Sequence, residues 1–383
     1  MSESNACLAS PTGQANSVSA IDIDRLNGVI RRLGEAVIDP ARWPVLMDAI
    51  CSAIGTTGAA LLQSDIRTPD VPMTASVSEF MKSYFDNQLH INDVRASRGV
   101  PLLLGGQSVV TDQDLFTSEQ EMLHDPLYAH AAKWNLRWWA GVGFRSGSAL
   151  WALALQRTSR EGPFEASTIE ALASLPARLT ETATLSKAVG RAALLTATNA
   201  LDLVRKPAIA LDRLGRVIDT NPAAEGLFSD DLRIADQRLL VHDRAAASEL
   251  DRLVDRLRNT SDSVALEVAP IVVQRAKLPT VIIRVLPVDG AARNPFLGAR
   301  AILILSDGAR KRLPELEILK RAFDLTMAEA RLARLIASGA SLEQAAAAIG
   351  VARETVRNQL KAIFIKSDTH RQSELVALLA RLE

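Results

Sequence analysis

The chain has 383 residues; 48% are hydrophobic, 23% are charged, and the formal net charge is zero. This length predicts two or three domains, and the composition is that of an ordinary globular protein. Cys7 and Cys51 lie too far apart in the sequence for a metal-binding pattern or a disulfide framework, which fits a reducing cytoplasm. No apolar run approaches the ~20 residues of a bilayer-spanning helix, so we expect a soluble, cytoplasmic protein without a membrane partner.

Residues 1–20 lack the basic start and apolar core of a signal peptide, so we expect a disordered tail there. Residues 21–164 have the pattern of an α+β domain, in which helices flank a small antiparallel sheet. The expected helices are 21–33, Trp43–Ile50, Ser78–Leu89 and Thr117–Ala132, the last capped by Thr117 with Gln120. The expected strands are Gly58–Gln63, Arg137–Phe144 and Ala149–Arg157, with a Ser-Gly-Ser turn before the last.

This order of elements, with the fragments Tyr84–Asp93 and Gly162–Phe164, resembles GAF domains and the autoinducer-binding domains of LuxR-type regulators. The resemblance implies an α-β-α sandwich with a pocket between sheet and helices, and hence a small-molecule ligand of unknown identity. Four of the five tryptophans lie where the sheet is expected: Trp134, Trp138, Trp139 and Trp151. They fit either a ligand pocket or ordinary core packing, and Trp138 and Trp139 cannot both face a pocket because strand neighbours alternate sides.

Residues 165–199 are expected to form a connector helix that is broken or bent at Pro176 and loosened at Gly190. Its partial apolar stripe consists of Leu172, Leu175, Leu179, Leu185 and Val189. The stripe is too short to establish a coiled coil, so two interpretations stay open. The helix either pairs with its twin in a homodimer or packs as a simple surface helix.

Residues 200–308 have a pattern of five strands with helices after the second. The expected strands are Ala208–Asp212, Arg216–Thr220, Val264–Val273, Thr280–Val288 and Arg300–Leu305. Asn221-Pro222 opens a short helix, and a longer helix contains Leu250 and Leu257. The element order and the opening segment PAIALDRLGRVIDTNPAAEGLF are similar to the PAS family.

PAS domains hold haem, flavin or small ligands, or only dimerise. This part of the chain has one histidine, His242, and no cysteine, so the cysteine of a flavin adduct is absent. A lone histidine is more often structural or solvent-facing than a haem ligand. We therefore expect no bound cofactor and no metal.

The last quarter of the chain contains three hydroxyl residues that each precede a Glu or Gln by three positions: Thr326 with Glu329, Ser341 with Gln344, and Thr369 with Gln372. This spacing predicts capping boxes at three helix starts. Gly339 and Gly350 stand where the first two helices should stop. The final helix, with Leu375, Leu378, Leu379 and Leu382, is more apolar than a monomer needs, and we expect its spare surface to pair two subunits.

The third predicted helix carries two different faces. Its apolar face consists of Val356, Leu360, Ile363 and Phe364, and its basic face of Arg353, Arg357 and Lys361. Residues 309–383 hold thirteen Lys and Arg against nine Asp and Glu, an excess of four positive charges in a neutral chain. A basic helix face of this kind is either a solvated surface or a nucleic-acid contact.

Residues 325–375 resemble the LuxR-type helix-turn-helix of bacterial transcription regulators. The resemblance is carried by Leu325, Thr326, Glu329, Gly339, Ser341, Ala346, Thr355, Val356, Leu360, Ile363, Lys366 and Arg371, and it departs from the common pattern at Ala352 and Gln359. It implies that the helix from about Arg353 to Phe364 enters the major groove of double-stranded DNA. Arg357, Asn358 and Lys361 would then approach base edges, and Arg353, Thr355, Lys366 and Arg371 would lie nearer phosphates.

No GxSxG, HExxH, Walker or dinucleotide motif is present, and we expect no enzymatic activity. The predicted architecture is multidomain: a GAF-like and a PAS-like α+β sensor domain precede an all-α LuxR-type helix-turn-helix domain at residues 313–383. The expected function is a one-component transcription regulator that acts as a homodimer. The alternative is a signalling adaptor whose sensor domains bind partner proteins and whose terminal helices form a dimerisation unit.

Overall fold

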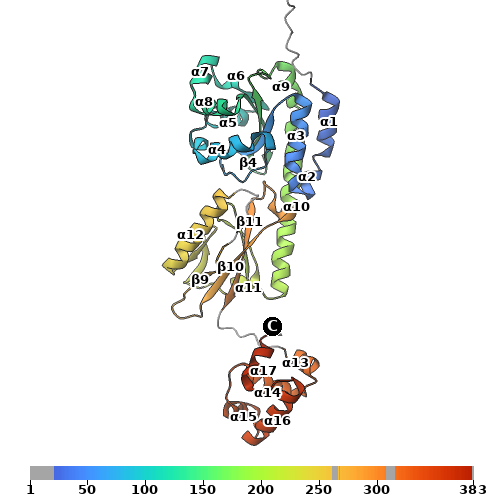
Figure 1. Cartoon of the computed structure of the whole chain (residues 1–383), viewed down its shortest axis with the longest axis vertical. Helices are drawn as coiled ribbons and strands as arrows, with labels where there is room; N and C mark the ends of the chain where they lie inside the picture. The colour runs from blue at the N-terminus through green and yellow to red at the C-terminus, as the bar shows by residue number, and fades with distance from the viewer. Residues whose placement is uncertain (1–20, 261–265, 267, 308–314, 382–383) are drawn as a thin grey trace, which may run out of the picture. The chain divides into compact units, whose positions relative to one another are not determined.

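The structure is a computed structural model that describes residues 21–260, 266, 268–307 and 315–381. By compactness the chain divides into two units, the first of residues 1–276 with 282–306 and the second of residues 277–281 with 307–383 (Figure 1). The first unit mixes helices with sheets, and the described residues after 307 are helical. The expected tail, Leu382 and part of the expected strand Val264–Val273 lie outside the described residues.

A four-stranded antiparallel sheet organises the N-terminal lobe of the first unit. Its strands are β1 (Gly58–Gln63), β2 (Val109–Thr111), β3 (Leu136–Ser146) and β4 (Ala149–Thr158), in the spatial order β1-β4-β3-β2. Gly147, at φ 62°, lies in the tight turn between β3 and β4, where a left-handed backbone favours glycine. The three predicted strands are present, and β2 is an addition.

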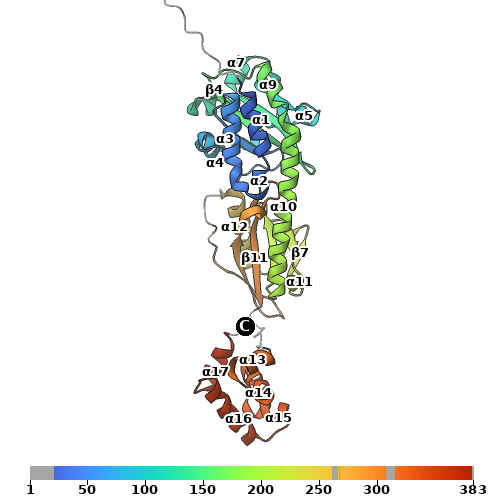
Figure 2. The same ribbon diagram turned by 90° about the vertical axis from the view of Figure 1, so that its right-hand side faces the viewer.

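Helices cover both faces of this sheet. One face carries α1 (Ile23–Arg32), α2 (Glu35–Ile38), α3 (Trp43–Ile54), α9 (Ala166–Leu172) and α10 (Leu175–Leu203) (Figure 2). The other carries α4 (Ser78–Asp86), α5 (Val94–Leu104), α6 (Asp112–Leu115), α7 (Glu119–His124) and α8 (Pro126–Ala131). Side chains alternate between the two faces, so Val142 and Leu153 pack with the first group, and Trp139 and Ala154 with the second.

The predicted single helix Thr117–Ala132 is wrong. Pro126 starts α8 and Asp125 caps it, so the chain forms two short helices instead of one. The cap of α7 is Ser118, whose side chain accepts a hydrogen bond from the backbone N–H of Glu121, whereas the Thr117 hydroxyl donates to the Glu121 carboxylate.

The connector is the 29-residue helix α10, which runs without a break from Leu175. Pro176 lies in its first turn, where proline removes no helical hydrogen bond, so this residue begins the helix and does not bend it. Gly190 is buried against the 3₁₀ turn η5 (Gly290–Arg293). It therefore permits a close contact, and the predicted loosening is wrong. Pairing of this helix with a second copy stays a prediction.

The second lobe of the first unit is built on a five-stranded sheet of order β6-β5-β11-β10-β9. The strands are β5 (Ala208–Asp212), β6 (Val217–Thr220), β9 (Ile271–Val273), β10 (Val281–Pro287) and β11 (Ala299–Asp307). The helices α11 (Pro222–Glu225) and α12 (Arg244–Asn259) follow β6, as predicted, and the hairpin of β7 (Leu232–Ala235) with β8 (Arg238–Val241) was not predicted.

The two lobes of the first unit share one core. Phe296 of the second lobe lies 5.6 Å from Trp43 and 5.0 Å from Trp151, measured between ring centroids. The fully buried Asp70 of the N-terminal lobe forms an ion pair with Arg300 of the second lobe. Burial lowers the pKa of Arg300 to about 10, which leaves the guanidinium charged at neutral pH. Arg213 also crosses between the lobes and donates to the Pro295 carbonyl at 2.5 Å and the Thr68 hydroxyl at 3.4 Å.

The second unit consists of short helices around a common core. They are α13 (Leu316–Phe323), α14 (Met327–Ala337), α15 (Leu342–Ile349), α16 (Arg353–Lys366) and α17 (Gln372–Leu379). Thr326 and Ser341 form the predicted capping boxes, and Gly339 and Gly350 have the predicted left-handed conformation. In both described units, no helix is long and apolar enough to cross a bilayer.

Two predictions for the end of the chain are corrected. Thr369 does not cap a helix, because its hydroxyl lies 2.9 Å from the Ser367 hydroxyl and α17 begins after Arg371 without a side-chain cap. Leu375 and Leu379 are buried in the core of the second unit, so these two leucines are not spare surface for a second subunit.

Candidate nucleic-acid interface and sensor pocket

Helix α16 buries one face and exposes the other. Val356, Leu360 and Ile363 are enclosed by the core of the second unit. The predicted contact residues lie outside this buried face and are all exposed: Arg353, Thr355, Arg357, Asn358 and Lys361. At 1.5 Å of rise per residue, the basic row from Arg353 to Lys361 is about 12 Å long, which is about the width of a B-DNA major groove.

The basic side chains of this row are held loosely. Arg353 Nη2 lies 2.9 Å from Glu343 Oε1, but both side chains are more than half exposed (69% and 59%). Such a surface pair stabilises by about 1 kcal/mol or less, so the guanidinium can exchange partners. Arg357 and Lys361 have no ion pair within the described part of the chain.

Lys366 has a different environment. Its Nζ lies 2.8 Å from Oε2 of Glu329, the residue that completes the capping box with Thr326. Partial burial raises the pKa of Glu329, but the bonds from Lys366 and Thr326 outweigh it and the net shift is downward. Arg371 remains largely exposed, with Nε 3.9 Å from Glu374 Oε1. Phosphate contacts by Lys366 and Arg371 stay predictions, and Lys366 also links α14 to α16.

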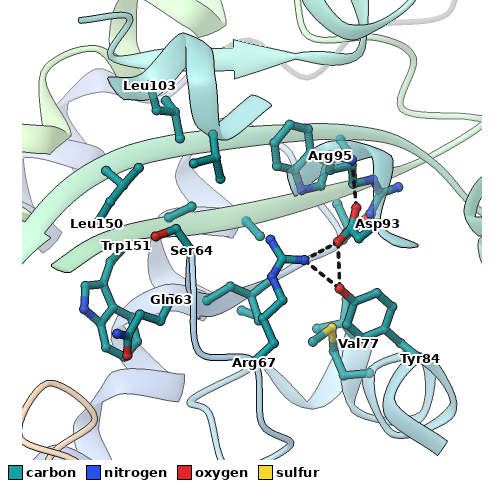
Figure 3. Close-up of a pocket in the computed structure, with 18 of the residues that line it drawn as sticks. Gln63, Ser64, Arg67, Val77, Tyr84, Asp93, Arg95, Leu103, Leu150 and Trp151 are labelled. Atoms are coloured by element: carbon teal, nitrogen blue, oxygen red, sulfur yellow. Dashed lines mark hydrogen bonds and ion pairs between the residues drawn. The ribbon is translucent and has the colours of Figure 1, made fainter. Parts of the chain in front are cut away.

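A pocket lies in the N-terminal lobe between the sheet and the helices α4 and α5 (Figure 3). Its empty volume is about 670 Å³, counting the part open to solvent, of which about 40 Å³ is wide enough for the centre of a water molecule. Small side chains on the sheet make this space: Ala60, Ala152 and Ala154. Val100, Leu103 and Phe80 form apolar walls.

A buried polar cluster lies at one side of this pocket. Arg67 Nη1 lies 2.5 Å from Asp93 Oδ2, and the Tyr84 hydroxyl donates to the same oxygen at 2.6 Å (Figure 3). The other carboxylate oxygen of Asp93 accepts from the backbone N–H of Arg95 at 2.7 Å. Burial and the Asp93 charge raise the pKa of Tyr84, which therefore stays a neutral donor.

A second cluster continues behind the first. Arg95 stacks on the Tyr128 ring at 4.4 Å and donates from Nε to the Tyr128 hydroxyl at 3.1 Å. That hydroxyl donates to Asp112, which also accepts from the backbone N–H of Trp139 at 2.6 Å. Burial raises the pKa of Asp112 to about 6, although Arg95 and the two donors oppose the shift.

The sequence did not reveal these clusters. The partners of Asp93 in the fold are Arg67 and Tyr84, which lie 26 and 9 residues earlier in the chain. The resemblance of Tyr84–Asp93 to sensor domains was the only local signal at this place. His242, in the second lobe, is exposed. Within the described residues, no group of three or more His, Cys, Asp or Glu side chains is placed to hold a metal ion.

The four tryptophans divide between pocket and core. Trp139 and Trp151 line the pocket, although Trp151 also packs on Phe296 in the core, and Trp138 packs partly buried against the cores on either side. Trp134 packs on Phe80 with ring centroids 5.8 Å apart. Both interpretations of the tryptophans are therefore correct in part, and Trp139 lines the pocket while its neighbour Trp138 does not, as predicted.

Comparisons with known proteins give little further information. No family model matches the chain, and no curated protein matches it. A solved structure of the phage VqmA-DPO complex is 14% identical over 49% of this chain and 88% of that chain, with a TM-score of 0.20. A structure of the E. coli DhaR(N)-DhaL complex is 12% identical over 77% of this chain and 91% of that chain, with a TM-score of 0.22. Likeness at these TM-scores carries no inference about fold or function.

Proposed function

We propose that this chain is a one-component transcription regulator that binds double-stranded DNA through helix α16. The observation that carries the proposal is the exposed row of Arg353, Arg357 and Lys361, which runs beside an apolar face that fixes the helix in the second unit. Loosely paired cations on a rigid helix can neutralise phosphates and release their counterions without first breaking a buried ion pair.

Within this proposal, the contacts divide by chemistry. Arg357 can donate two parallel hydrogen bonds to guanine, and Asn358 can pair in the same way with adenine. Arg353 and Arg371 are assigned to phosphates, which position the helix without reading sequence. Two copies of the chain acting together would present two such helices to successive half-sites.

The first unit supplies the regulatory part of the proposal. We assign its N-terminal lobe the role of a GAF-like or autoinducer-like sensor and its second lobe that of a PAS-like domain. Regulation then requires that a signal bound by the first unit change the availability or spacing of the α16 helices. The strength of this coupling is the difference in DNA-binding free energy between the signal-free and the signal-bound protein, which can be measured.

The test begins with genome-wide mapping of the DNA that the full-length protein binds, followed by anisotropy titrations on the recovered site. Arg357→Ala should weaken binding by about 1–3 kcal/mol and reduce preference at one base position. Arg331→Ala is the matched control, because it removes the same charge from an exposed position on α14. Equal affinities for wild type and Arg357→Ala would refute the assignment of the recognition face.

The competing proposal is a signalling adaptor whose terminal helices only dimerise. The burial of Leu375 and Leu379 within the second unit leaves less of α17 for that role. Salt dependence separates the two functions: a regulator loses affinity for its site steeply between 50 and 200 mM salt, by roughly tenfold or more, whereas an adaptor shows no site to titrate. Sedimentation of the same samples reports whether the DNA-bound form is a dimer.

A further inference from the structure

Two polar atoms in the wall of the sensor pocket have no hydrogen-bond partner among the described residues. One is Nη2 of Arg95, which is 7% exposed, and the other is Oε1 of Gln156, which is 4% exposed. A buried donor or acceptor without a partner is costly, and most such groups in folded proteins bind water or a ligand. The pair therefore marks a place that a polar molecule can fill.

Both atoms belong to residues grouped around Trp139. Gln156 is the strand partner of Trp139 between β4 and β3, and Cζ of Arg95 lies 5.6 Å from the centre of the Trp139 ring. All three residues line the same pocket. An occupant beside Trp139 can thus face an N–H donor from Arg95 and a carbonyl acceptor from Gln156.

Charge in this region is balanced before any occupant arrives. Arg67 is paired with Asp93, and Arg95 is linked through Tyr128 to Asp112. An anion would add an uncompensated negative charge beside these buried carboxylates, and a cation would add a positive one beside two buried arginines. The balance favours a neutral occupant.

The rest of the wall determines size and polarity. Ala152 and Ala154 of the sheet and Val100 and Leu103 of α5 give the pocket an apolar lining. The space wide enough for the centre of a water molecule, about 40 Å³, exceeds what one water needs but admits only a small or slender molecule. A short alkyl chain with a polar end matches this outline.

We propose that the pocket binds a small neutral molecule that carries a carbonyl oxygen beside an N–H group, as a short-chain amide does. The oxygen accepts a hydrogen bond from Arg95 Nη2, the N–H donates to Gln156 Oε1, and the alkyl part lies on Ala152 and Ala154. The proposal concerns binding alone, so its failure and the failure of the DNA-binding function are separate outcomes.

Hexanamide and hexanoate are suitable probes because they have nearly the same shape and differ in charge and in the N–H donor. Each is titrated into the full-length protein, and intrinsic fluorescence reports binding because Trp139 and Trp151 line the pocket. Hexanamide should give a saturable change, and hexanoate should bind at least tenfold more weakly. Absence of saturable hexanamide binding, as expected for a pocket that holds only water, overturns the proposal, as does equal affinity for hexanoate.

Two matched variants test the polar contacts. Gln156→Leu replaces the unpartnered amide by an apolar side chain that the core accepts, and it should weaken hexanamide binding roughly tenfold. Gln63→Leu is the control, because Gln63 lines the same pocket but its Nε2 already donates to Asp65 at 2.9 Å. Unchanged affinity in Gln156→Leu, or an equal loss in both variants, refutes the assigned geometry.

Discussion

Replacing Gly190 by alanine tests how the long helix α10 is joined to the second lobe. A Cβ atom at this position would lie 1.9 Å from Nδ2 of Asn294 and 2.7 Å from the backbone oxygen of Ala291. Asn294 is fully buried, and its Nδ2 donates to the carbonyls of Ser186 and Ala291, each at 3.0 Å. Alanine therefore displaces a side chain that joins α10 to the η5 turn.

Two opposing effects set the magnitude. Glycine to alanine in a helix interior normally stabilises by up to about 1 kcal/mol. Here the amide of Asn294 must move, and each of its two buried donor bonds that is left unmade costs about 1–3 kcal/mol. The net loss should be roughly 1–5 kcal/mol, so the clash outweighs the gain in helix propensity.

Urea unfolding followed by tryptophan fluorescence measures this loss in the first unit, because all five tryptophans lie there. Gly28→Ala in α1 is the matched control: the nearest heavy atom to its Cβ would be Arg31 Nη2, at 3.9 Å. That variant should gain about 0.5–1 kcal/mol. If Gly190→Ala is as stable as wild type or gains as much as Gly28→Ala, the close contact does not exist as described.

Four further outcomes are expected. Ala352→Ser supplies the absent cap of α16 and should stabilise that helix by about 0.5–1 kcal/mol, seen as slower amide hydrogen exchange; unchanged exchange argues against the assigned helix start. Ser341→Ala removes a capping box and should destabilise α15 by about 0.5–1 kcal/mol, which faster amide hydrogen exchange in that helix would report. The pKa of Asp112 rises from 3.8 to about 6 on folding, so its protonated form favours the native state. The unfolding free energy should therefore fall by roughly 2 kcal/mol between pH 4 and 7 relative to Asp112→Asn, and parallel pH profiles contradict this. Asp70→Asn leaves Arg300 buried without its counter-charge and should cost the first unit about 3–5 kcal/mol in urea unfolding, whereas a loss below about 1 kcal/mol indicates a hydrated pair.

The features that the sequence predicted are those that neighbouring residues determine. Strand Ala208–Asp212 and the capping boxes of Thr326 and Ser341 depend on side chains within a few positions. The predicted capping box of Thr369 is absent, because the Thr369 hydroxyl forms a hydrogen bond with the Ser367 hydroxyl before helix α17 begins. Pro126 is the sequence signal that divides the helix predicted over residues 117–132, because proline starts a helix readily but interrupts one.

The pocket of the N-terminal lobe could not be assembled from sequence because its polar residues come from separate elements. Arg67 precedes α4, Tyr84 lies in α4, and Asp93 caps α5. Only the packing of these helices on the sheet brings the charges together. The packing of α10 on both lobes is likewise a tertiary property. Asn294 packs against Gly190 from more than a hundred residues away, and no residue near Gly190 in the sequence indicates this contact.

One short peptide after β1 touches both lobes. Arg67 faces the pocket, and three residues later Asp70 is held by Arg300, at the start of the central strand β11 of the second sheet. Because removing a buried charge from its partner costs several kcal/mol, Asp70 is a fixed anchor for this peptide. An occupant that displaced Arg67 would therefore pull on a peptide whose other end is fixed to β11 through Asp70 and Arg300.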